Sequence, residues 1–305
     1  MAPNWKLGLG FTLITALMWG TLPVALKGLL NSMDPLTISW YRFASSALIA
    51  MLLYGRRNTK ALRKLCSKPH RGLLLVTTLA LLCNYMFYLF GLDYITASAT
   101  QMIIQLAPLL LLLGGVFIFN EPFSGKQWGG VAIFTIGMVL FFHHRLNGVV
   151  TTDPSYLLGV ALTIAAACSW ATFSLAQKKL LKVSTSGNIL VLICIAGTVV
   201  YFPVASPLQI IQLDGLQLGL LAFVCLNTLV SYGSFGLALS YWEASRASVI
   251  LTIAPLITLL TVRLVSHQFP DYIAAEPLDW LSWTGGGLVV LGSIISAMTK
   301  KQNRT

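Results

Sequence analysis

Charged residues are scarce in this chain, and that scarcity excludes most kinds of soluble protein. Charged side chains make up 10% of the 305 residues, whereas hydrophobic residues make up 56%. Ordinary soluble domains carry roughly 25% charged residues. Twenty Lys and Arg with nine Asp and Glu cannot cover the surface of a soluble protein of this length. The composition therefore excludes a soluble enzyme, a nucleic-acid-binding protein and a secreted disulfide scaffold.

Motifs for catalysis and metal binding are also missing. The five cysteines are dispersed without a C-x-x-C pair, so the sequence indicates neither a metal knuckle nor a redox motif. There is no metal-spaced cluster of His, Asp and Glu, no nucleophile elbow and no phosphate-binding glycine loop. We therefore expect no catalytic residues, no metal site and no cofactor, which argues against an integral membrane enzyme.

Long apolar segments are what the chain does contain. Runs of about 20 such residues, long enough to cross the roughly 30 Å hydrocarbon core, recur along it. They predict an all-α polytopic membrane protein with ten transmembrane helices. The expected spans are 7–28, 36–54, 72–91, 96–119, 127–143, 155–176, 187–205, 215–237, 246–266 and 280–298. No small-residue cleavage site follows the first span, so we expect it to be retained rather than removed as a signal peptide.

The basic residues predict how the helices are oriented. Sixteen of the 20 Lys and Arg fall on the side of the two termini, and the exceptions are Lys27, Arg42, Arg145 and Arg263. Positive residues mark the cytoplasmic side. Both termini are thus expected in the cytoplasm, and the basic side is expected to touch anionic lipid head groups. A plasma membrane, of the bacterial inner-membrane kind, is the expected location.

The sequence repeats itself once. Offsets of 151, 147 and 155 align the two halves, 1–146 and 147–305, each of which holds five expected spans. The aligned pairs include Trp19 with Trp170, Tyr85 with Tyr232, Pro108 with Pro255, Glu121 with Glu276, Gly130 with Gly285 and Gly137 with Gly292. Because five is odd, the second half must enter the membrane upside down, which gives two inverted five-helix repeats. Such halves can exchange conformations around a central site, as alternating access requires.

The layout resembles the drug/metabolite transporter superfamily, EamA type. The residues that carry the resemblance are Trp19-Gly20-Thr21-x-Pro23, Pro35 leading to Arg42-Phe43, Ala97 to Pro108, and Glu121-Pro122 followed by Gly130 and Gly137. The resemblance implies a ten-helix carrier that moves small metabolites, often amino acids and often outward. It also implies a central cavity lined by the first, third, fourth, sixth, eighth and ninth spans. The second half departs from the pattern at Trp170-Ala171-Thr172, which lacks the Gly and the Pro.

Polar and aromatic residues inside the spans are the candidate substrate-binding residues, because polar groups in hydrocarbon usually face a cavity or another helix. They are Trp19, Asn84, Tyr85, Tyr88, Gln101, Gln105, Trp170, Asn227, Ser231 and Tyr232. Together they would form a largely uncharged, aromatic-lined cavity suited to a small amphipathic metabolite. The alternative is that the aromatic residues form interfacial belts and the amides hold helices together.

Three prolines and two cations complete the candidates. Pro23, Pro108 and Pro255 each free a backbone carbonyl and are expected to kink or gate a helix. Lys27 and Arg42 are expected toward the outer side, where they pair with Asp34, bind a substrate carboxylate or snorkel to head groups. The pairs Gly130/Gly137 and Gly285/Gly292 are expected to form a close-packing seam rather than a dimer interface.

No Asp or Glu falls in the middle of a span, and the histidines lie at span ends or in loops. Proton-coupled carriers often use a buried carboxylate or His. We therefore expect facilitated transport or exchange, with a small-molecule metabolite and the lipid bilayer as partners and no nucleic acid; the sequence leaves the oligomeric state open. The alternative is a lipid-linked sugar or small-lipid flippase of the same superfamily, for which only Lys27 and Arg42 offer positive charge.

Overall fold

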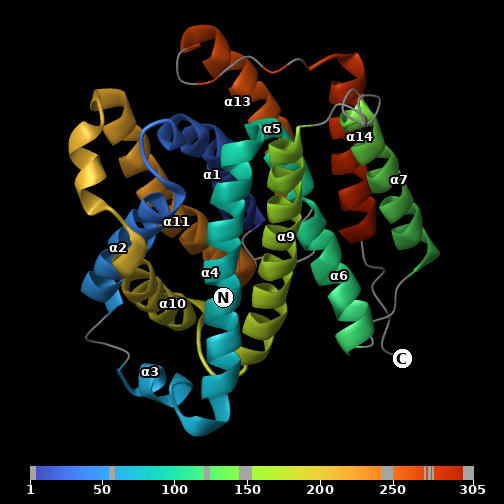
Figure 1. Cartoon of the computed structure of the whole chain (residues 1–305). Coiled ribbons are helices and arrows are strands. Elements are labelled where there is room, and N and C mark those ends of the chain that lie inside the picture. The colour runs from blue at the N-terminus through green and yellow to red at the C-terminus, as the bar shows by residue number, and fades with distance from the viewer. Residues whose placement is uncertain are drawn as a thin grey trace.

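The computed structural model describes residues 5–54, 59–119, 124–143, 153–241, 250–270, 273, 276 and 278–297. Over these ranges the chain forms helices and connecting turns, without a strand (Figure 1). The helices are α1 (Trp5–Leu30), α2 (Pro35–Tyr54), α3 (Thr59–Leu65), α4 (Lys68–Tyr94), α5 (Ala97–Ile103), α6 (Leu106–Phe119), α7 (Gly125–Phe141), α9 (Pro154–Leu180), α10 (Ser186–Tyr201), α11 (Gly215–Tyr241), α13 (Ala254–Gln268) and α14 (Trp280–Ala297). Two 3-10 turns, Phe202–Val204 and Pro207–Gln212, join α10 to α11.

Several of these helices are built to cross a membrane. Five described segments, in α1, α4, α9, α10 and α11, are 19 to 27 residues long and apolar enough to span the hydrocarbon core. Large apolar side chains such as Leu52, Leu79 and Val199 remain exposed on the outer surface of the bundle. A surface of this kind is stable against lipid and not against water. The chain is a multi-pass, all-helical membrane protein.

Polar residues fix where the helices begin. The Asp34 carboxylate accepts hydrogen bonds from the backbone N–H groups of Leu36 (2.9 Å) and Thr37 (3.0 Å) at the start of α2. Ser124 and Gln127 form a reciprocal capping box at α7. These caps satisfy amide groups that the helix itself leaves unpaired. They also show that Asp34 is used as a helix cap.

The expected span 96–119 is not one helix, and the prediction of a continuous helix there is wrong. The segment is broken into α5 and α6 at Ile104 and Gln105. Pro108 lacks the N–H that would bond to the Ile104 carbonyl, and this carbonyl accepts instead from the N–H of Ala107 at 2.9 Å. A similar tight bond, from the N–H of Leu256 to the Ile253 carbonyl at 3.0 Å, lies beside Pro255 at the start of α13. The part of the expected span 246–266 before residue 250 lies outside the described residues.

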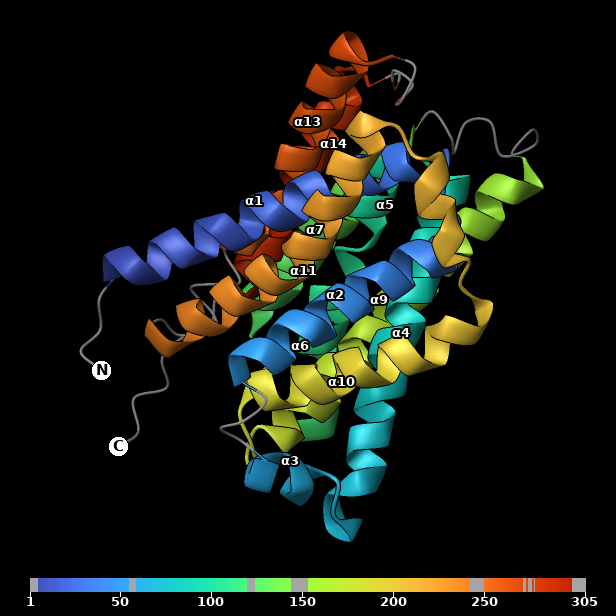
Figure 2. The ribbon, with the colours of Figure 1, turned by 90° about the vertical axis from the view of Figure 1, so that its left-hand side faces the viewer.

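The helices pack in pairs that an inverted repeat requires. α1 lies along α11 and α2 lies along α10 (Figure 2), while α4 lies along α9. The repeat exchanges α1 with α9 and α4 with α11, so the first and third of these pairs are counterparts. The same two positions are hydrogen-bonded in both pairs, with the direction reversed. Asn84 Nδ2 donates to the Ala166 carbonyl (2.9 Å), whereas Thr15 Oγ1, the counterpart of Ala166, donates to the carbonyl of Ser231, the counterpart of Asn84 (3.4 Å). The two halves therefore share packing as well as sequence.

The fifth helices of the two halves meet in a glycine seam, on the right of Figure 1. A Cβ built on Gly130 of α7 would lie 2.6 Å from the Ser296 nitrogen of α14. A Cβ built on Gly137 would lie 2.6 Å from the Val289 nitrogen and 2.8 Å from the Gly285 oxygen. Only glycine permits such close backbone approach. The expected close-packing seam therefore lies within the chain, between α7 and α14.

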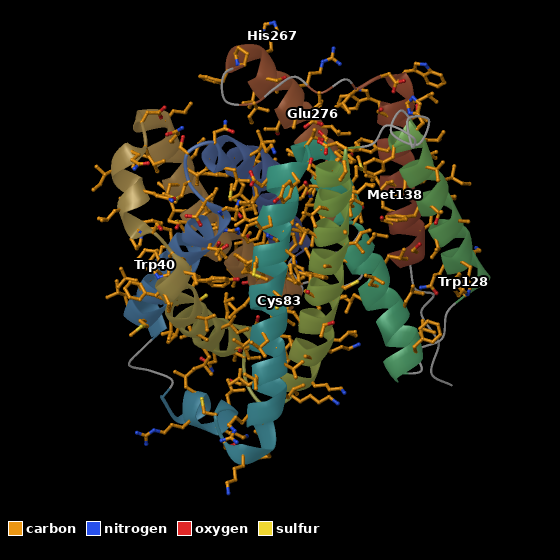
Figure 3. The ribbon with its side chains drawn as sticks, in the orientation of Figure 1. Trp40, Cys83, Trp128, Met138, His267 and Glu276 are labelled. Atoms are coloured by element: carbon orange, nitrogen blue, oxygen red, sulfur yellow. The ribbon has the colours of Figure 1, made fainter. Side chains whose placement is uncertain are left out.

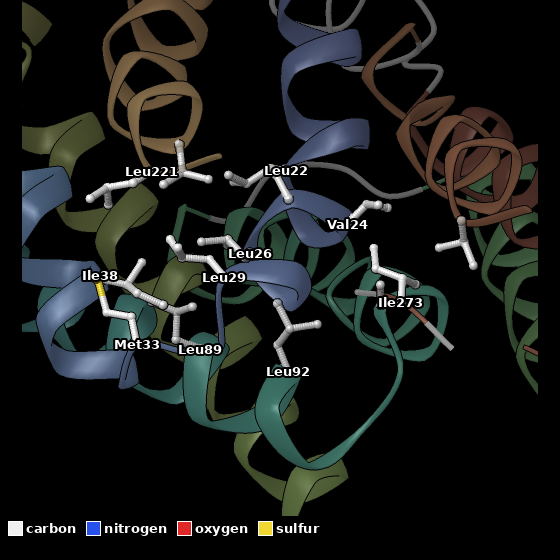
Figure 4. Close-up of a cluster of buried hydrophobic side chains, with 14 of the residues drawn as sticks. Leu22, Val24, Leu26, Leu29, Met33, Ile38, Leu89, Leu92, Leu221 and Ile273 are labelled. Carbon is white, nitrogen blue, oxygen red and sulfur yellow. The ribbon is translucent and has the colours of Figure 1, made fainter. Parts of the chain in front are cut away.

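The largest buried apolar cluster joins the ends of α1, α2 and α4 (Figure 4). It contains Leu26, Leu29, Ile38, Leu89 and Leu92, all of them fully buried, and continues into α11 and the segment before α14. Burying side chains of this size contributes roughly 1.5–3 kcal/mol each relative to water, although lipid is the competing environment for a membrane protein. This cluster packs α1, α2 and α4 together at the end of the bundle that the charge pattern predicts to be outer.

Candidate functional site

Arg42 is a buried cation inside the helix bundle. It lies about 10 Å along α2 from Pro35, at 1.5 Å per residue, and its residue is 4% exposed. Its Nε donates to Thr228 Oγ1 of α11 (3.2 Å), and its Nη2 lies 3.5 Å from the Tyr85 hydroxyl of α4. The guanidinium also sits over the Tyr85 ring, 4.4 Å from the ring centroid. The expectations that Arg42 snorkels or pairs with Asp34 are both wrong, because Arg42 is held deep in the bundle and Asp34 caps α2.

Aromatic side chains from four helices gather around this cation. Phe43 packs on Tyr85 with ring centroids 4.5 Å apart. Tyr88 and Tyr232 both lie within range of an electrostatic interaction with Arg42. The Trp170 side chain, from α9, lies beside Tyr232. We call Arg42, Tyr85, Tyr88, Trp170, Thr228 and Tyr232 the Arg42 cluster. It combines one cation with large amphipathic rings.

Trp19 joins the same region from α1. Its ring lies 5.8 Å from the Tyr232 ring in an edge-to-face arrangement and 5.8 Å from the Phe235 ring. Trp19 and Trp170 are counterparts in the repeat, and Tyr232 contacts both of them. The structure thus brings five of the expected aromatic residues together, namely Trp19, Tyr85, Tyr88, Trp170 and Tyr232.

The two glutamines of the expected fourth span lie at the break between α5 and α6. Gln101 and Gln105 are each 6% exposed. Within the described part of the chain, neither side-chain amide has a hydrogen-bond partner. Pro108 is exposed and Pro255 is buried, each within the first turn of its helix. The break therefore places two polar side chains where the backbone itself is irregular.

The other expected polar residues lie between helices. Asn84 binds the α9 backbone as described above, which makes it a helix-packing residue. Asn227 Nδ2 donates to the Met18 carbonyl of α1 at 2.6 Å. Asn227 Oδ1 and Ser231 Oγ are buried and have no hydrogen-bond partner among the described residues. These two oxygen atoms on α11 could each accept a further hydrogen bond.

Near Pro23, the backbone of α1 binds to its neighbours. Besides the Met18 carbonyl, the Gly20 carbonyl accepts a hydrogen bond from Thr258 Oγ1 of α13 at 2.5 Å. A Cβ on Gly20 would lie 2.6 Å from Cβ of Ile257. Helix α1 continues through the proline. Asn227 of α11 and Thr258 of α13 thus hydrogen-bond to backbone carbonyls of α1 in the turn before Pro23.

Lys27 caps the end of α4 and does not snorkel. Its Nζ donates to the carbonyls of Leu92 (2.7 Å), Asp93 (2.8 Å) and Ile95 (3.1 Å). These are carbonyls that the end of α4 leaves unpaired, and a cation there also complements the helix dipole. The sequence showed Lys27 as a charge near a helix end but gave no sign of this partner.

Glu276 performs the matching role at the start of α5. Its carboxylate accepts from the Ser98 N–H at 3.3 Å, and Figure 3 shows Glu276 on the same side of the molecule as His267. Burial raises the pKa of this carboxyl, while hydrogen bonds from Ser98 and Thr96 and the charge of Lys27 act to lower it. Lys27 and Glu276 thus hold the two sides of the α4–α5 junction. Glu276 was missed as a site residue, although its repeat partner Glu121 marked the position.

An apolar cavity of about 230 Å³ opens between α1, α11 and α13 at the same end. Its lining is hydrophobic apart from Thr21 and Thr261, and includes Val24, Leu220 and Phe269. No group of three or more His, Cys, Asp or Glu that could hold a metal ion occurs among the described residues. This cavity suits an apolar chain.

A bundle of paired, inverted helices around a buried polar and aromatic centre defines a class of protein, the multi-pass membrane transporters. The EamA-like transporter family model matches the chain twice, over residues 6–143 and 157–298. The chain belongs to this EamA-like transporter family. The two matches also correspond to the two halves of the repeat.

Relatives cover almost the whole chain. An "uncharacterized transporter" of Haemophilus influenzae is 35% identical over 97% of this chain and 96% of its own length. The "uncharacterized inner membrane transporter YhbE" of Escherichia coli is 36% identical over 96% and 91%. A "probable amino-acid metabolite efflux pump" of Escherichia coli is 26% identical over 93% and 92%. A solved crystal structure at 16% identity superposes with a TM-score of 0.67 over 96% of both chains, which supports the fold.

Proposed function

We propose that the protein exports small amphipathic metabolites, such as amino acids, by alternating access. The Arg42 cluster carries this proposal, because it offers polar and aromatic contacts from helices of both halves at one place. The relationship to a probable amino-acid metabolite efflux pump supports the substrate class. The paired packing supports the mechanism, since counterpart helices can exchange their arrangements.

The transport mode we propose is facilitated diffusion or exchange. Described carboxylates lie at helix ends or in loops, as Asp34, Asp93 and Glu276 do, and His143 lies at the end of α7, where it pairs with Asp279 at 3.2 Å. A proton relay through the centre would need a titratable group deep in the membrane.

We also propose a bacterial inner-membrane location with both termini in the cytoplasm, because most Lys and Arg residues fall on the side of the termini. Pro23, Pro108 and Pro255 are proposed as bending points during the exchange.

Counterflow into proteoliposomes tests the proposal. Vesicles loaded with unlabelled amino acid should take up the labelled compound in a saturable way, which a channel or scaffold cannot produce. Tyr85→Ala should weaken this uptake at least several-fold because it removes the ring beneath Arg42. Phe117→Ala is the matched control, since Phe117 is 75% exposed on α6. Saturable uptake that Tyr85→Ala leaves unchanged would reject the site, and uptake driven uphill by a pH gradient would reject the transport mode.

A small-lipid or lipid-linked flippase is the second candidate function. The apolar cavity between α1, α11 and α13 favours it, since a lipid tail could enter there while a polar head reaches inward. A fluorescent lipid assay in the same vesicles separates the two candidates. Lipid translocation without amino-acid counterflow would favour the flippase.

A further inference from the structure

Arg42 carries a positive charge that no carboxylate in the described part of the chain neutralises. A charged side chain taken out of water is stable only when it is paired or hydrogen-bonded throughout. The described carboxylates are placed elsewhere. Asp34, Asp153, Asp214 and Asp279 hold helix starts, Glu276 holds the α5 start, and Asp93 is exposed at the end of α4.

The contacts that Arg42 does make leave part of the guanidinium unused. The group has five N–H donors in a fixed fork. Nε is taken by Thr228, and one Nη2 donor points to the Tyr85 hydroxyl at the long distance of 3.5 Å. The ring of Tyr85 covers one face at 4.4 Å. Among the described residues, nothing accepts from Nη1. An edge of the fork is therefore left for a planar, bidentate acceptor.

The fold itself does not require this cation. Helices α2 and α10 start 151 residues apart, at Pro35 and Ser186, which is the offset that aligns Trp19 with Trp170, and at this offset Arg42 falls on Ile193. Ile193 is fully buried in an apolar cluster with Phe43 and Leu81. The second half thus fills the equivalent position with a hydrophobic side chain. A buried charge kept in one half alone points to a task other than packing.

The rings around Arg42 suit the rest of such a ligand. Tyr88 and Tyr232 lie near the cation, and Trp170 lies beside Tyr232. Aromatic faces bind apolar or aromatic groups at small cost in entropy. The unpartnered acceptors Asn227 Oδ1 and Ser231 Oγ lie on α11, next to and one turn from Thr228.

We propose that Arg42 binds a carboxylate of the transported substrate, whose apolar part lies among Tyr85, Tyr88 and Tyr232. This inference rests on the proposed carrier function and narrows it to carboxylate-bearing metabolites. Amines and uncharged compounds of the same shape are then poor substrates. Arg42 acts by a bidentate salt bridge, so Lys is an incomplete replacement.

A pair of ligands with one skeleton tests this. In purified protein, 3-phenylpropionate should raise the thermal midpoint of the wild type, and phenethylamine should not. Arg42→Gln should weaken the apparent affinity for 3-phenylpropionate at least tenfold, and Arg42→Lys should weaken it less. Arg263→Gln, which removes an exposed cation of α13, should leave the affinity within about twofold.

Several outcomes overturn the inference. Equal stabilisation of the wild type by phenethylamine does so, and so does unchanged affinity in Arg42→Gln. A complete lack of stabilisation by arylcarboxylates also rejects it. The comparison of the two ligands on wild-type protein needs no variant, so it holds even if Arg42→Gln fails to fold. Counterflow of phenethylamine or phenylacetamide without carboxylate binding would keep the carrier function and reject the Arg42 site, whereas no counterflow of any compound would reject the carrier function itself.

Discussion

The glycine seam between α7 and α14 allows a stability prediction with an internal control. Gly130 and Gly129 are neighbours in one helix, but only Gly130 faces α14. A Cβ on Gly130 would meet the Ser296 nitrogen at 2.6 Å and the Gly292 oxygen at 2.8 Å, whereas a Cβ on Gly129 meets nothing within 4 Å. We therefore predict that Gly130→Ala destabilises the protein relative to Gly129→Ala.

The size of the effect follows from these distances. Carbon contacts are optimal at about 3.5 Å or more, so the two helices must separate by several tenths of an ångström. The clashing atoms are backbone and cannot turn away. Overpacking of this kind costs about 1–3 kcal/mol. Alanine gains up to about 1 kcal/mol over glycine in helix propensity at both positions, and this gain cancels in the comparison. Gly130→Ala should thus be about 1–3 kcal/mol less stable than Gly129→Ala.

Thermal unfolding in detergent, followed with a thiol-reactive dye, measures the difference. Cys194 is buried and reports unfolding, while Cys66 and Cys168 are exposed and would be replaced by Ser in every variant. About 2–4 °C per kcal/mol is typical of chains of 150–250 residues. Midpoints that agree within 1 °C would refute the packing argument. A change in oligomeric state without a change in midpoint would instead assign the seam to an interface between copies.

Three further variants test the α4–α5 junction and the helix contacts. Lys27→Met should cost about 1.5–3 kcal/mol in unfolding free energy, because it leaves the carbonyls at the end of α4 unpaired; Lys68→Met, at an exposed site, should change little. Burial raises the pKa of Glu276 above its ordinary value of 4.5, so the folded state binds this proton more tightly. Its contribution to stability therefore increases as pH falls toward that value and decreases as pH rises, a dependence of the thermal midpoint that Glu276→Gln should remove. Asn84→Ala should lower the midpoint without changing the apparent substrate affinity, and a weakened affinity would return Asn84 to the binding site.

Much of the fold could be predicted from the sequence because apolar length and helix caps are local properties. The expected spans 36–54, 155–176 and 280–298 agree closely with α2, α9 and α14. The break at Ile104 and Gln105 was not predicted, although Pro108 was recognised as a kink. A proline shows which carbonyl loses its partner, but not whether the chain bends or changes to a tighter turn. That outcome depends on the neighbours of α5, which lie far away in sequence.

The candidate site was predicted in part for the same reason. The aromatic residues of the Arg42 cluster lie inside the expected apolar spans, and the repeat singled out Trp19, Tyr85 and Tyr232. Lys27 and Asn84 found backbone partners on other helices, which no pattern within their own helix reveals. Glu276 shows the same limit, since its amide partners belong to the start of α5. The sequence thus indicates which polar residues lie within the membrane spans. Tertiary packing decides whether such a residue binds a substrate or pairs with the backbone at a helix end.

The two halves differ because packing of the scaffold and binding of a substrate place different requirements on the sequence. An inverted repeat needs matched surfaces where its halves slide or lock, and the matched glycines of α7 and α14 meet there. A substrate that is itself asymmetric has no use for a matched pair of cations, and a second buried charge would only add a desolvation cost. One half carries Arg42 and the other carries Ile193 at the aligned position. The repeat therefore shapes the moving scaffold, while the departure from it at Arg42 specifies what is carried.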